Sequence, residues 1–250
     1  MFRPRVIPVL LLRKEGLVKT EGFGRQRYIG DPINAVRIFN DLRADELVFL
    51  DILATREGRL ISLDFVRNVG EEANMPFAVG GGIRSLPNIR NILSAGAEKV
   101  VINSFAAENP DFIAEAADSF GSSTITVCID AKKTWRGASR TWTAGGTRAT
   151  GYPPEEFARL VQDKGAGEII VQSISRDGTM EGYDLDLIRR VSEAVTIPVV
   201  ALGGAGRLDH LRQAYHETHA SGFAAGSMFV FHGPKRGVLI NYPDRSEIQF

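Results

Sequence analysis

Eight short apolar runs, rich in β-branched residues, alternate with segments of helical periodicity along the 250-residue chain. Strands that alternate with helices form parallel sheets, because each helix carries the chain back across the sheet. Eight such units in a chain of this length predict an α/β fold, a closed (β/α)8 TIM barrel in a single domain over residues 1–250. The runs begin near residues 5, 46, 76, 99, 124, 168, 198 and 222.

The spacing of these runs repeats. The gaps between the first four starts and those between the last four agree to within three residues, so we expect a barrel built of two similar halves. In each half the first run is followed by a long connection, residues 13–30 and 132–152. Both leave the carboxyl ends of strands, where barrel active sites form, and loops of this length are usually functional or mobile. We expect residues 135–146 to form a flexible lid.

The segment after the eighth run does not have the pattern of a regular helix. It contains two glycines and two prolines, Gly233, Pro234, Gly237 and Pro243, and proline interrupts helices. We predict a short or irregular final helix. His232 also lies in this segment, and we interpret it as a structural or contact residue and not as a catalytic one.

The composition excludes several classes of partner. Thirty basic and thirty acidic residues cancel, so no overall positive field attracts nucleic acid or an anionic membrane. The single cysteine, Cys128, excludes an intrachain disulfide and a cysteine-based zinc site, and its apolar run predicts a buried, inert thiol. The apolar run near the start of the sequence is too short to span a bilayer. We expect a cytoplasmic protein without metal or cofactor.

Two glycine-rich turns follow matching strands, one at Gly81 and Gly82 and the other at Gly203 and Gly204. Glycine lets backbone N–H groups approach an anion closely, and the helix that follows adds its positive N-terminal end. A tight strand-to-helix turn would explain either copy alone. Two copies at matching places of an internal repeat favour a pair of phosphate cradles.

Polar residues that could carry chemistry gather at the carboxyl ends of the strands. Asp130 ends an otherwise apolar run, a position where burial can tune the pKa of a carboxylate for acid and base work; the alternative is a carboxylate that caps a neighbouring loop. When the two halves are superposed, Leu11 takes the place of Asp130, so one member of a possible acid–base pair is missing. The other candidates are Lys19, Asp51, Asn103, Ser173, Asp177 and Ser227.

Four charged residues stand at the amino-terminal starts of strands, at the opposite rim of the predicted barrel. They are Arg5, Glu46, Lys99 and Glu168. Two cations and two anions around the bottom of a barrel could close a ring of salt bridges. The alternative is a solvated charged rim, which contributes little to stability.

These residues resemble the cyclase subunit of imidazole glycerol phosphate synthase. The resemblance extends over nearly the whole chain, through motifs such as GLVKT, VGGGIRS, CIDAKK, RDGT and GGAG. It implies a barrel that binds a bis-phosphorylated nucleotide intermediate across its mouth. It also implies a glutaminase subunit docked beneath the barrel, whose ammonia passes through the interior and drives closure of the imidazole ring.

The resemblance implies a role for individual residues. Lys19 and Asp51 would face the ligand, and Asp45 would lie where the glutaminase docks. The four rim charges, Arg5, Glu46, Lys99 and Glu168, match the family's gate at the ammonia entrance. One phosphate is expected at Gly81, Gly82, Asn103 and Ser104, and the other at Asp177, Gly178, Gly203, Gly204, Gly226 and Ser227. Of the family's catalytic carboxylate pair, Asp130 is present, and Leu11 replaces its partner.

Leucine can neither accept nor donate a proton, and loss of a paired acid or base costs a factor of ~10² to 10⁴ in rate. Residues 7–20 and 229–243 also resemble the branch of this family found in surface-polysaccharide gene clusters, which the resemblance links to a separate amidotransferase that forms an acetamidino sugar. We therefore favour an ammonia-conducting synthase subunit. The alternatives are a working histidine-pathway cyclase, with Asp51 or Glu15 replacing the missing carboxylate, and an aminoimidazole ribotide isomerase, which the rim charges disfavour.

Overall fold

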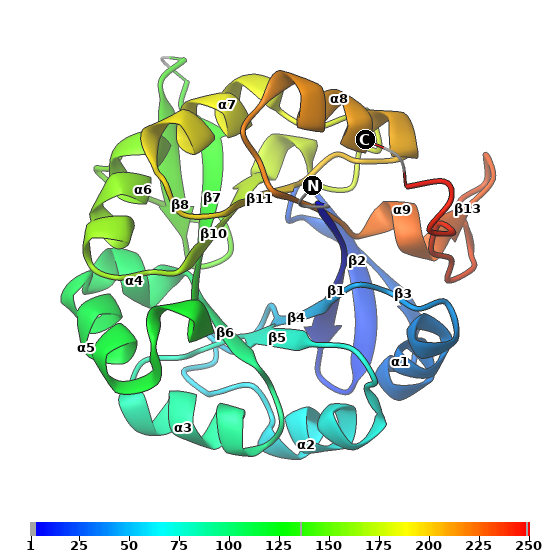
Figure 1. Ribbon diagram of the computed structural model, residues 1–250, viewed down its shortest axis with the longest axis horizontal. Coiled ribbons are helices and arrows are strands. Elements are labelled where there is room, and N and C mark those ends of the chain that lie inside the picture. Colours follow the sequence, from blue (N-terminus) through cyan, green and yellow to red (C-terminus); the bar gives the residue numbers. More distant parts are fainter. Residues whose placement is uncertain (1–3, 136, 249) are drawn as a thin grey trace.

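The computed structural model describes residues 4–135, 137–248 and 250, and it shows a closed parallel barrel surrounded by helices (Figure 1). Strand β1 pairs with β12 on one side and β4 on the other, and β7 pairs with β10, which closes the sheet. The predicted (β/α)8 fold is confirmed. The barrel strands are β1 (Arg5–Arg13), β4 (Leu47–Asp51), β5 (Phe77–Gly80), β6 (Lys99–Ile102), β7 (Ile125–Lys133), β10 (Glu168–Ser173), β11 (Val199–Leu202) and β12 (Gly222–Ala225).

The helices lie on the outside of the barrel (Figure 1), and a side-chain cap begins the first of them. The carboxylate of Asp31 accepts a hydrogen bond from the Asn34 N–H at 2.7 Å and so caps the first helix, whose first residue is a proline. The helices are α1 (Pro32–Asp41), α2 (Leu63–Glu72), α3 (Leu86–Ser94), α4 (Ser104–Glu108), α5 (Asp111–Phe120), α6 (Pro154–Asp163), α7 (Leu185–Ala194), α8 (Leu208–Glu217) and α9 (Ser227–Val230), with 3-10 turns at Ser122–Thr124 and Ile174–Arg176.

Two apolar layers stabilise this arrangement. Along β1, Val6, Leu10 and Leu12 belong to the layer between strands and helices, whereas Ile7 and Val9 belong to a second cluster inside the barrel. This alternation follows from the two-residue period of a strand, which points successive side chains to opposite faces. The barrel interior is therefore filled with apolar side chains along most of its length.

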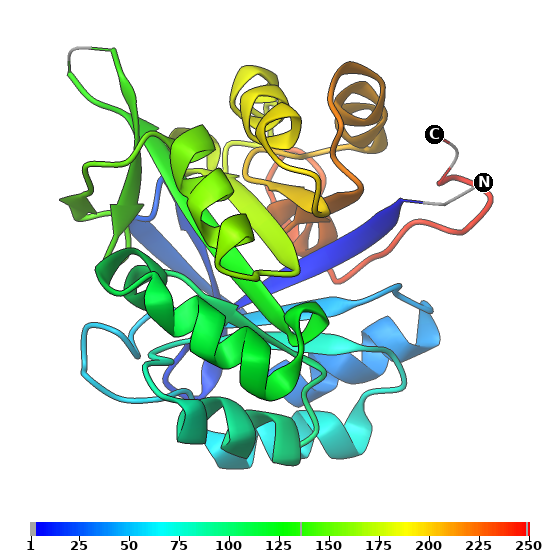
Figure 2. The same ribbon diagram turned by 60° about the vertical axis from the view of Figure 1, so that its left-hand side comes forward.

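The expectation of two long loops after β1 and β7 is wrong in form, because each connection folds as a β-hairpin. Strand β2 (Gly16–Glu21) pairs antiparallel with β1 and with β3 (Arg25–Gly30), and β8 (Ser139–Thr143) pairs antiparallel with β7 and with β9 (Arg148–Ala149). Both reversals contain glycines of positive φ, +57° at Gly22 and +65° at Gly145. The hairpin of β7 and β8 extends away from the barrel body (Figure 2), and part of the expected lid segment, Ser139–Thr143, is paired strand.

Strand register confirms the match between the two halves. Leu11 of β1 lies opposite Leu50 of β4, and Asp130 of β7 lies opposite Gln172 of β10. On their other side both residues face the first hairpin strand, Leu11 opposite Val18 of β2 and Asp130 opposite Trp142 of β8. Leu11 and Asp130 therefore hold equivalent positions in the two halves.

The chain ends as the sequence predicted, without a regular final helix. Helix α9 has four residues and leads into a short antiparallel pair, β13 (Phe231–His232) and β14 (Gly237–Val238). The following segment returns to the amino-terminal face of the barrel, where the Tyr242 hydroxyl donates a hydrogen bond to the Val6 carbonyl at 2.9 Å. Among the described helices, none combines the length and apolar character that a membrane span requires.

Candidate functional site

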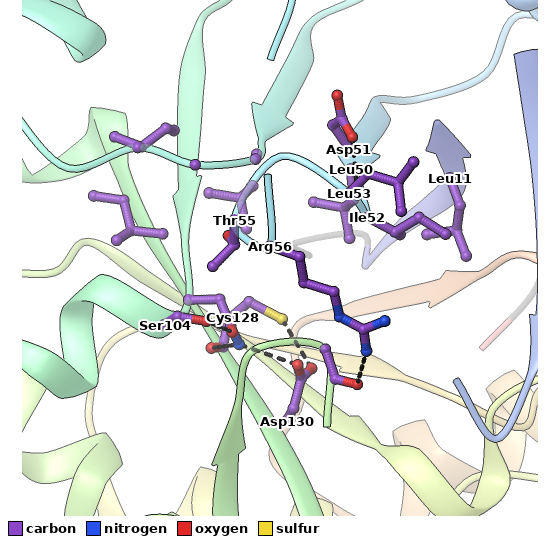
Figure 3. A pocket seen from close by; sticks show the side chains of 18 of the residues that line it. Leu11, Leu50, Asp51, Ile52, Leu53, Thr55, Arg56, Ser104, Cys128 and Asp130 are labelled. Atoms are coloured by element: carbon purple, nitrogen blue, oxygen red, sulfur yellow. Dashed lines mark hydrogen bonds between the residues drawn. The ribbon is translucent and has the colours of Figure 1, made fainter. Parts of the chain in front are cut away.

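Two adjoining cavities hollow the mouth of the barrel. The larger, about 1100 Å³ and open to solvent, lies over the N-terminal half and receives the side chains of Leu11 and Asp130 from different strands (Figure 3). The smaller, about 360 Å³, lies over the C-terminal half. Leu11 and Gln172 line both, so one groove crosses the mouth. Of the predicted ligand residues, the larger cavity brings together Asp51, Gly81, Gly82, Asn103, Ser104 and Asp130, and the smaller one Lys19, Asp177, Gly178, Gly203, Gly204, Gly226 and Ser227.

The first glycine turn leaves no room for side chains. Gly82 has a φ of +70°, and a Cβ atom there would lie 1.8 Å from the Arg59 carbonyl oxygen. The Gly81 carbonyl accepts a hydrogen bond from the Ile61 N–H at 3.0 Å, which fixes the turn against the loop that follows β4. The backbone of this turn is thereby held at the floor of the larger cavity.

The second glycine turn has the same construction. Gly204 has a φ of +106°, and a Cβ atom there would lie 2.1 Å from the Gly182 carbonyl oxygen. The Gly204 carbonyl accepts a hydrogen bond from the Gly182 N–H at 2.8 Å. Each turn is thus packed against the loop from the preceding strand of its own half, and each exposes backbone to its cavity.

Asp130 is the residue at the mouth with the properties of a general acid or base. Its buried carboxylate accepts hydrogen bonds from Asn103 Nδ2 at 3.2 Å and from Cys128 Sγ at 3.6 Å. Burial raises the pKa of Asp130 to about 7, with a further contribution from the negative charge of Asp177, although the two hydrogen bonds oppose this rise. A carboxyl group that titrates near neutral pH can both donate and accept protons.

Asp51, the other carboxylate in the lining of the larger cavity as the structure describes it, is fully engaged. It accepts hydrogen bonds from the N–H groups of Leu53 and Ala54 at 3.0 and 3.1 Å, and it forms an ion pair with Arg59 at 2.6 Å. Both oxygens therefore organise the loop after β4. The alternative in which Asp51 replaces the missing carboxylate has no support in this geometry.

Lys19 and Asp177 lie together at the smaller cavity. The buried Lys19 ammonium donates a hydrogen bond to the Val9 carbonyl at 2.6 Å, and a Cβ atom on Gly226 would lie 1.8 Å from its Nζ. Burial lowers the pKa of Lys19 to about 8, and the nearby Asp177 opposes this. Burial also raises the pKa of Asp177, while bonds from the Thr20 hydroxyl and the Phe23 N–H counteract it.

Two hairpins lie at the mouth, the first formed by β2 and β3 and the second by β8 and β9. Each of them reaches across the mouth to the other half. Thr20 and Phe23 of the first hairpin bond to Asp177, which belongs to the C-terminal half. In return, the Ala144 N–H at the turn of the second hairpin donates to the Ser104 hydroxyl at 2.9 Å in the N-terminal half. The tips approach each other, since a Cβ atom on Gly146 would lie 3.0 Å from the Phe23 ring. The two connections that the sequence singled out therefore border the groove, with Phe23 and Gly145 in the lining of the larger cavity.

The four rim charges form a closed ring at the amino-terminal end of the barrel. Arg5 donates to both Glu46 and Glu168, and the Lys99 ammonium lies 3.4 Å from Glu46 and 3.2 Å from Glu168. The glutamate side chains are only 5% and 8% exposed, which contradicts the alternative of a solvated rim. Asp45, beside the ring, accepts a hydrogen bond from the Val6 N–H at 3.1 Å.

Three residues of the site were not singled out from the sequence. Gln172 joins the two cavities, and as a polar residue within an apolar strand it carried a signal that could have identified it. Arg59 neutralises Asp51, and Arg56 donates to the Gly145 carbonyl at 3.3 Å. No sequence signal indicates these two, because their contacts depend on how the loop after β4 folds. His232 lies exposed in β13, away from the residues that line either cavity.

The fold and the groove define a class of protein: a two-fold repeated (β/α)8 barrel with a matched glycine turn in each half. Comparison with known proteins identifies the family, because residues 5–234 match the one described as "Histidine biosynthesis protein". The chain belongs to this family.

Similar proteins carry a more specific name. A protein of Leptospira borgpetersenii, "Putative imidazole glycerol phosphate synthase subunit HisF", is 46% identical over 99% of this chain and 98% of its own length. Proteins of Vibrio vulnificus and Pseudomonas aeruginosa, with the same description and the subunit names hisF3 and hisF2, are each 43% identical over 99% of this chain and 95% and 99% of their lengths. The general function is therefore that of a HisF-type cyclase subunit.

Proposed function

We propose that this chain is the synthase subunit of a cytoplasmic glutamine amidotransferase complex, which binds a bis-phosphorylated ligand and conducts ammonia with its own cyclase chemistry weakened. The observation that carries the proposal is Leu11, which holds the register position of Asp130 in the other half. The ammonia would serve a separate sugar amidotransferase in acetamidino-sugar biosynthesis for the lipopolysaccharide O-antigen. The names hisF2 and hisF3 of two relatives fit a branch that exists beside another HisF.

The route proposed for ammonia runs along the barrel axis. The ring of Arg5, Glu46, Lys99 and Glu168 forms its entrance, and a glutaminase docked at this face, beside Asp45, would release ammonia there. Above the ring the interior is apolar, lined by residues that include Ile7, Val48, Val101, Ile170 and Ala224. Neutral ammonia loses its hydrogen bonds to water in such surroundings, but the desolvation penalty for the ammonium ion is much larger. The interior therefore favours passage of the neutral form.

The mouth fits a ligand with a phosphate at each end. Both glycine turns present backbone at opposite ends of one groove, and N–H groups in such turns bind anions. The Lys19 ammonium supplies positive charge at the C-terminal-half cradle. Asn103 and Ser104 supply side-chain donors at the other cradle, where Ser104 is bonded to the hairpin turn at Ala144.

The absence of a carboxylate at position 11 limits the chemistry. Cleavage and ring closure require protons to be removed and delivered at different atoms, and a pair of groups in different protonation states performs this efficiently. Here Asp130 supplies one such group. Asp51 is held by Arg59, and Glu15 lies exposed in the turn between β1 and β2. We therefore expect a rate about 10² to 10⁴ below that of a complete pair.

The second candidate is a working cyclase of histidine biosynthesis. It is favoured by the charged ring, the two matched glycine turns and Asp130, each of which has the position that such a cyclase would need. The isomerase alternative has less support, because that reaction uses no ammonia and the buried ring would then have no role beyond stability.

The experiment that separates these candidates measures turnover of the bis-phosphorylated intermediate with saturating ammonium salt and no glutaminase. We compare the natural chain with Leu11→Asp and, as a matched control that adds polarity without proton transfer, Leu11→Asn. A slow natural chain with recovery only in Leu11→Asp supports the proposal. Ordinary enzymatic turnover by the natural chain would contradict it and favour the histidine-pathway cyclase.

A further inference from the structure

Each glycine turn is held by a side chain from the first turn of the helix that follows it. In the N-terminal half the Arg84 N–H donates to Asn88 Oδ1 at 3.1 Å, and in the C-terminal half the Gly206 N–H donates to His210 Nδ1 at 3.1 Å. Donor and acceptor are four residues apart in both cases and occupy matching places of the repeat. The two halves thus use the same bond but different acceptors.

His210 supports the second turn from two sides. Besides the bond to Gly206, its ring packs against Gly182, where a Cβ atom would lie 3.7 Å from His210 Cδ2. The Gly182 N–H in turn donates to the Gly204 carbonyl at 2.8 Å. The imidazole is only 7% exposed, so it is a packed part of the turn.

We propose that His210 is a positioning residue that holds the second glycine turn in its anion-binding shape only while Nδ1 carries no proton, so that acid weakens anion binding in this half alone. The inference rests on the proposed role of the two turns as phosphate cradles. The hydrogen bond that holds the second turn is therefore sensitive to pH, whereas the corresponding bond of the first turn is not.

The chemistry of the acceptor decides this difference. Neutral imidazole has one nitrogen that accepts a hydrogen bond, whereas the imidazolium ion has two donors and no acceptor. Protonation would therefore leave the partly buried Gly206 N–H facing another N–H group, and a donor that is shielded from water and has no acceptor is costly. The amide oxygen of Asn88 accepts a hydrogen bond at any pH near neutrality.

The surroundings place the transition on the acid side. Burial, followed by the positive charge of Arg207, lowers the pKa of His210, and the negative charge of Asp209 opposes this. Both charged residues lie at the start of α8, and the residue packed against the ring from the other loop, Gly182, carries no charge. The turn therefore stays intact at neutral pH and loosens as the pH falls below the ordinary histidine pKa of about 6.5.

The test uses inorganic sulfate, a phosphate mimic that remains a dianion throughout the pH range used. Amide NMR signals of residues 81–84 and 203–206 report sulfate binding at each turn separately between pH 7.5 and pH 5. Lys19 and Asp177 also line this cavity and have shifted pKa values, but they are common to the natural chain and to His210→Asn. Relative to His210→Asn, we expect affinity at 203–206 in the natural chain to fall about tenfold, which is what the loss of one hydrogen bond supports. Affinity at 81–84 should not fall.

Exchange of the two acceptors supplies matched variants. His210→Asn should keep the bond and lack this tenfold fall at 203–206, and Asn88→His should transfer the fall to 81–84. A fall at 203–206 of equal size in His210→Asn overturns the inference about His210 and leaves the cradles standing. Absence of sulfate binding at both turns at every pH overturns the cradles themselves, and the inference with them.

Discussion

At the scale of single residues, two carboxylates at the mouth differ because of their neighbours. Asp51 is paired with Arg59 and bonded to two backbone N–H groups, so its negative charge is stabilised and its oxygens are used. Asp130 is equally buried but lacks a cationic partner among the contacts that the structure describes, and its pKa rises to about 7. Burial without a counter-ion is what makes Asp130 suitable for proton transfer.

The raised pKa of Asp130 predicts a cost in stability at high pH. The folded state holds the proton up to about pH 7, whereas an unfolded aspartic acid releases it near the ordinary value of 3.8. The folded state therefore binds more protons between these values, and the contribution of Asp130 to stability falls as the pH rises through this window.

We expect Asp130→Asn to raise the free energy of unfolding at pH 8 by up to about 4 kcal/mol, because the pKa of Asp130 rises from 3.8 to about 7 and each pKa unit corresponds to about 1.4 kcal/mol. The gain should shrink toward zero as the pH approaches 4. Urea unfolding at pH 8, 6 and 4 measures both. Asp111→Asn on the outer surface of α5, where the side chain is 75% exposed, is the control. An equal gain at all three pH values would contradict the prediction.

At the residue scale, the sequence predicted that Leu11 of the first half replaces the equivalent of Asp130, but it did not predict the contacts of Asp51. Superposing the two halves of the sequence was enough to show that Leu11 occupies the position equivalent to Asp130, because strand register is preserved between the halves. It could not show that Asp51 is occupied. That depends on Arg59, which approaches only after the loop beyond β4 has folded back on itself.

At the scale of elements, the two hairpins are the part of the fold that the sequence misassigned. Residues 13–30 and 132–152 read as loops because of their glycines and polar residues. Both β1 and β7 run beyond the barrel wall, and each offers a free edge that the chain can pair with when it turns back. Pairing of this kind depends on tertiary geometry, so it cannot be predicted from the local β-propensity of the sequence.

The first hairpin is held over the groove by Asp177, and this makes a prediction for Thr20→Val. The change preserves shape and removes the hydroxyl that bonds to Asp177 at 2.6 Å. Amide hydrogen exchange in residues 16–30 should accelerate about five- to tenfold, because one hydrogen bond contributes about 1 kcal/mol. Thr147→Val removes a bond within the second hairpin and should affect residues 139–149 only. Unchanged exchange in 16–30 would show that Asp177 does not hold this hairpin.

Tyr242, in the C-terminal segment, links the starts of β1 and β4, which are not hydrogen-bonded to each other at that point. The ladder between β1 and β4 begins at Val9 and Val48, but the strands start earlier. There the Tyr242 hydroxyl donates to the Val6 carbonyl and accepts from the Asp45 N–H at 3.2 Å. Val6 and Asp45 are the chain neighbours of Arg5 and Glu46, so Tyr242 braces the ring of charges.

We expect Tyr242→Phe to lower the free energy of unfolding by about 1–3 kcal/mol, since it leaves the partly buried Asp45 N–H and the buried Val6 carbonyl with one partner fewer. Chemical denaturation measures this change. The control is Tyr215→Phe, because Tyr215 packs through its ring against Phe223 and Phe250 and should tolerate loss of the hydroxyl. Equal losses in the two variants would remove the brace as an explanation.

At the scale of the whole molecule, the repeat explains why the barrel could be predicted so well. Strand starts, their spacing and the glycine turns are all repeated, and the structure places each observed barrel strand within one residue of its expected start. What the repeat could not reveal is how the halves are joined. The hairpins cross over the mouth, and at the other end the ring of charges links Arg5, Glu46 and Lys99 of the first half to Glu168 of the second.

A double-mutant cycle tests whether this ring acts as one unit. Glu46 and Glu168 share Arg5 and Lys99 as partners, and they repel each other across the ring. Either single change to glutamine removes attraction to two cations, and we expect it to cost about 2–3 kcal/mol in unfolding free energy, somewhat less than for fully buried pairs because the cations are 22–25% exposed. Each single change also relieves the repulsion between the glutamates.

The double variant removes the repulsion between Glu46 and Glu168 only once, whereas the sum of the two single changes counts its removal twice. The loss of unfolding free energy in the double variant should therefore exceed the sum of the two single losses by at least about 0.5 kcal/mol. The matched control combines Glu46→Gln with Glu72→Gln, which breaks an ion pair with Arg37 on the outer helices; these two should add within about 0.3–0.5 kcal/mol. Additive losses for Glu46 and Glu168 would mean that the ring consists of independent pairs. Non-additive losses would mean that Glu46 of the first half and Glu168 of the second are energetically coupled through the ring, as a gate that spans both halves requires.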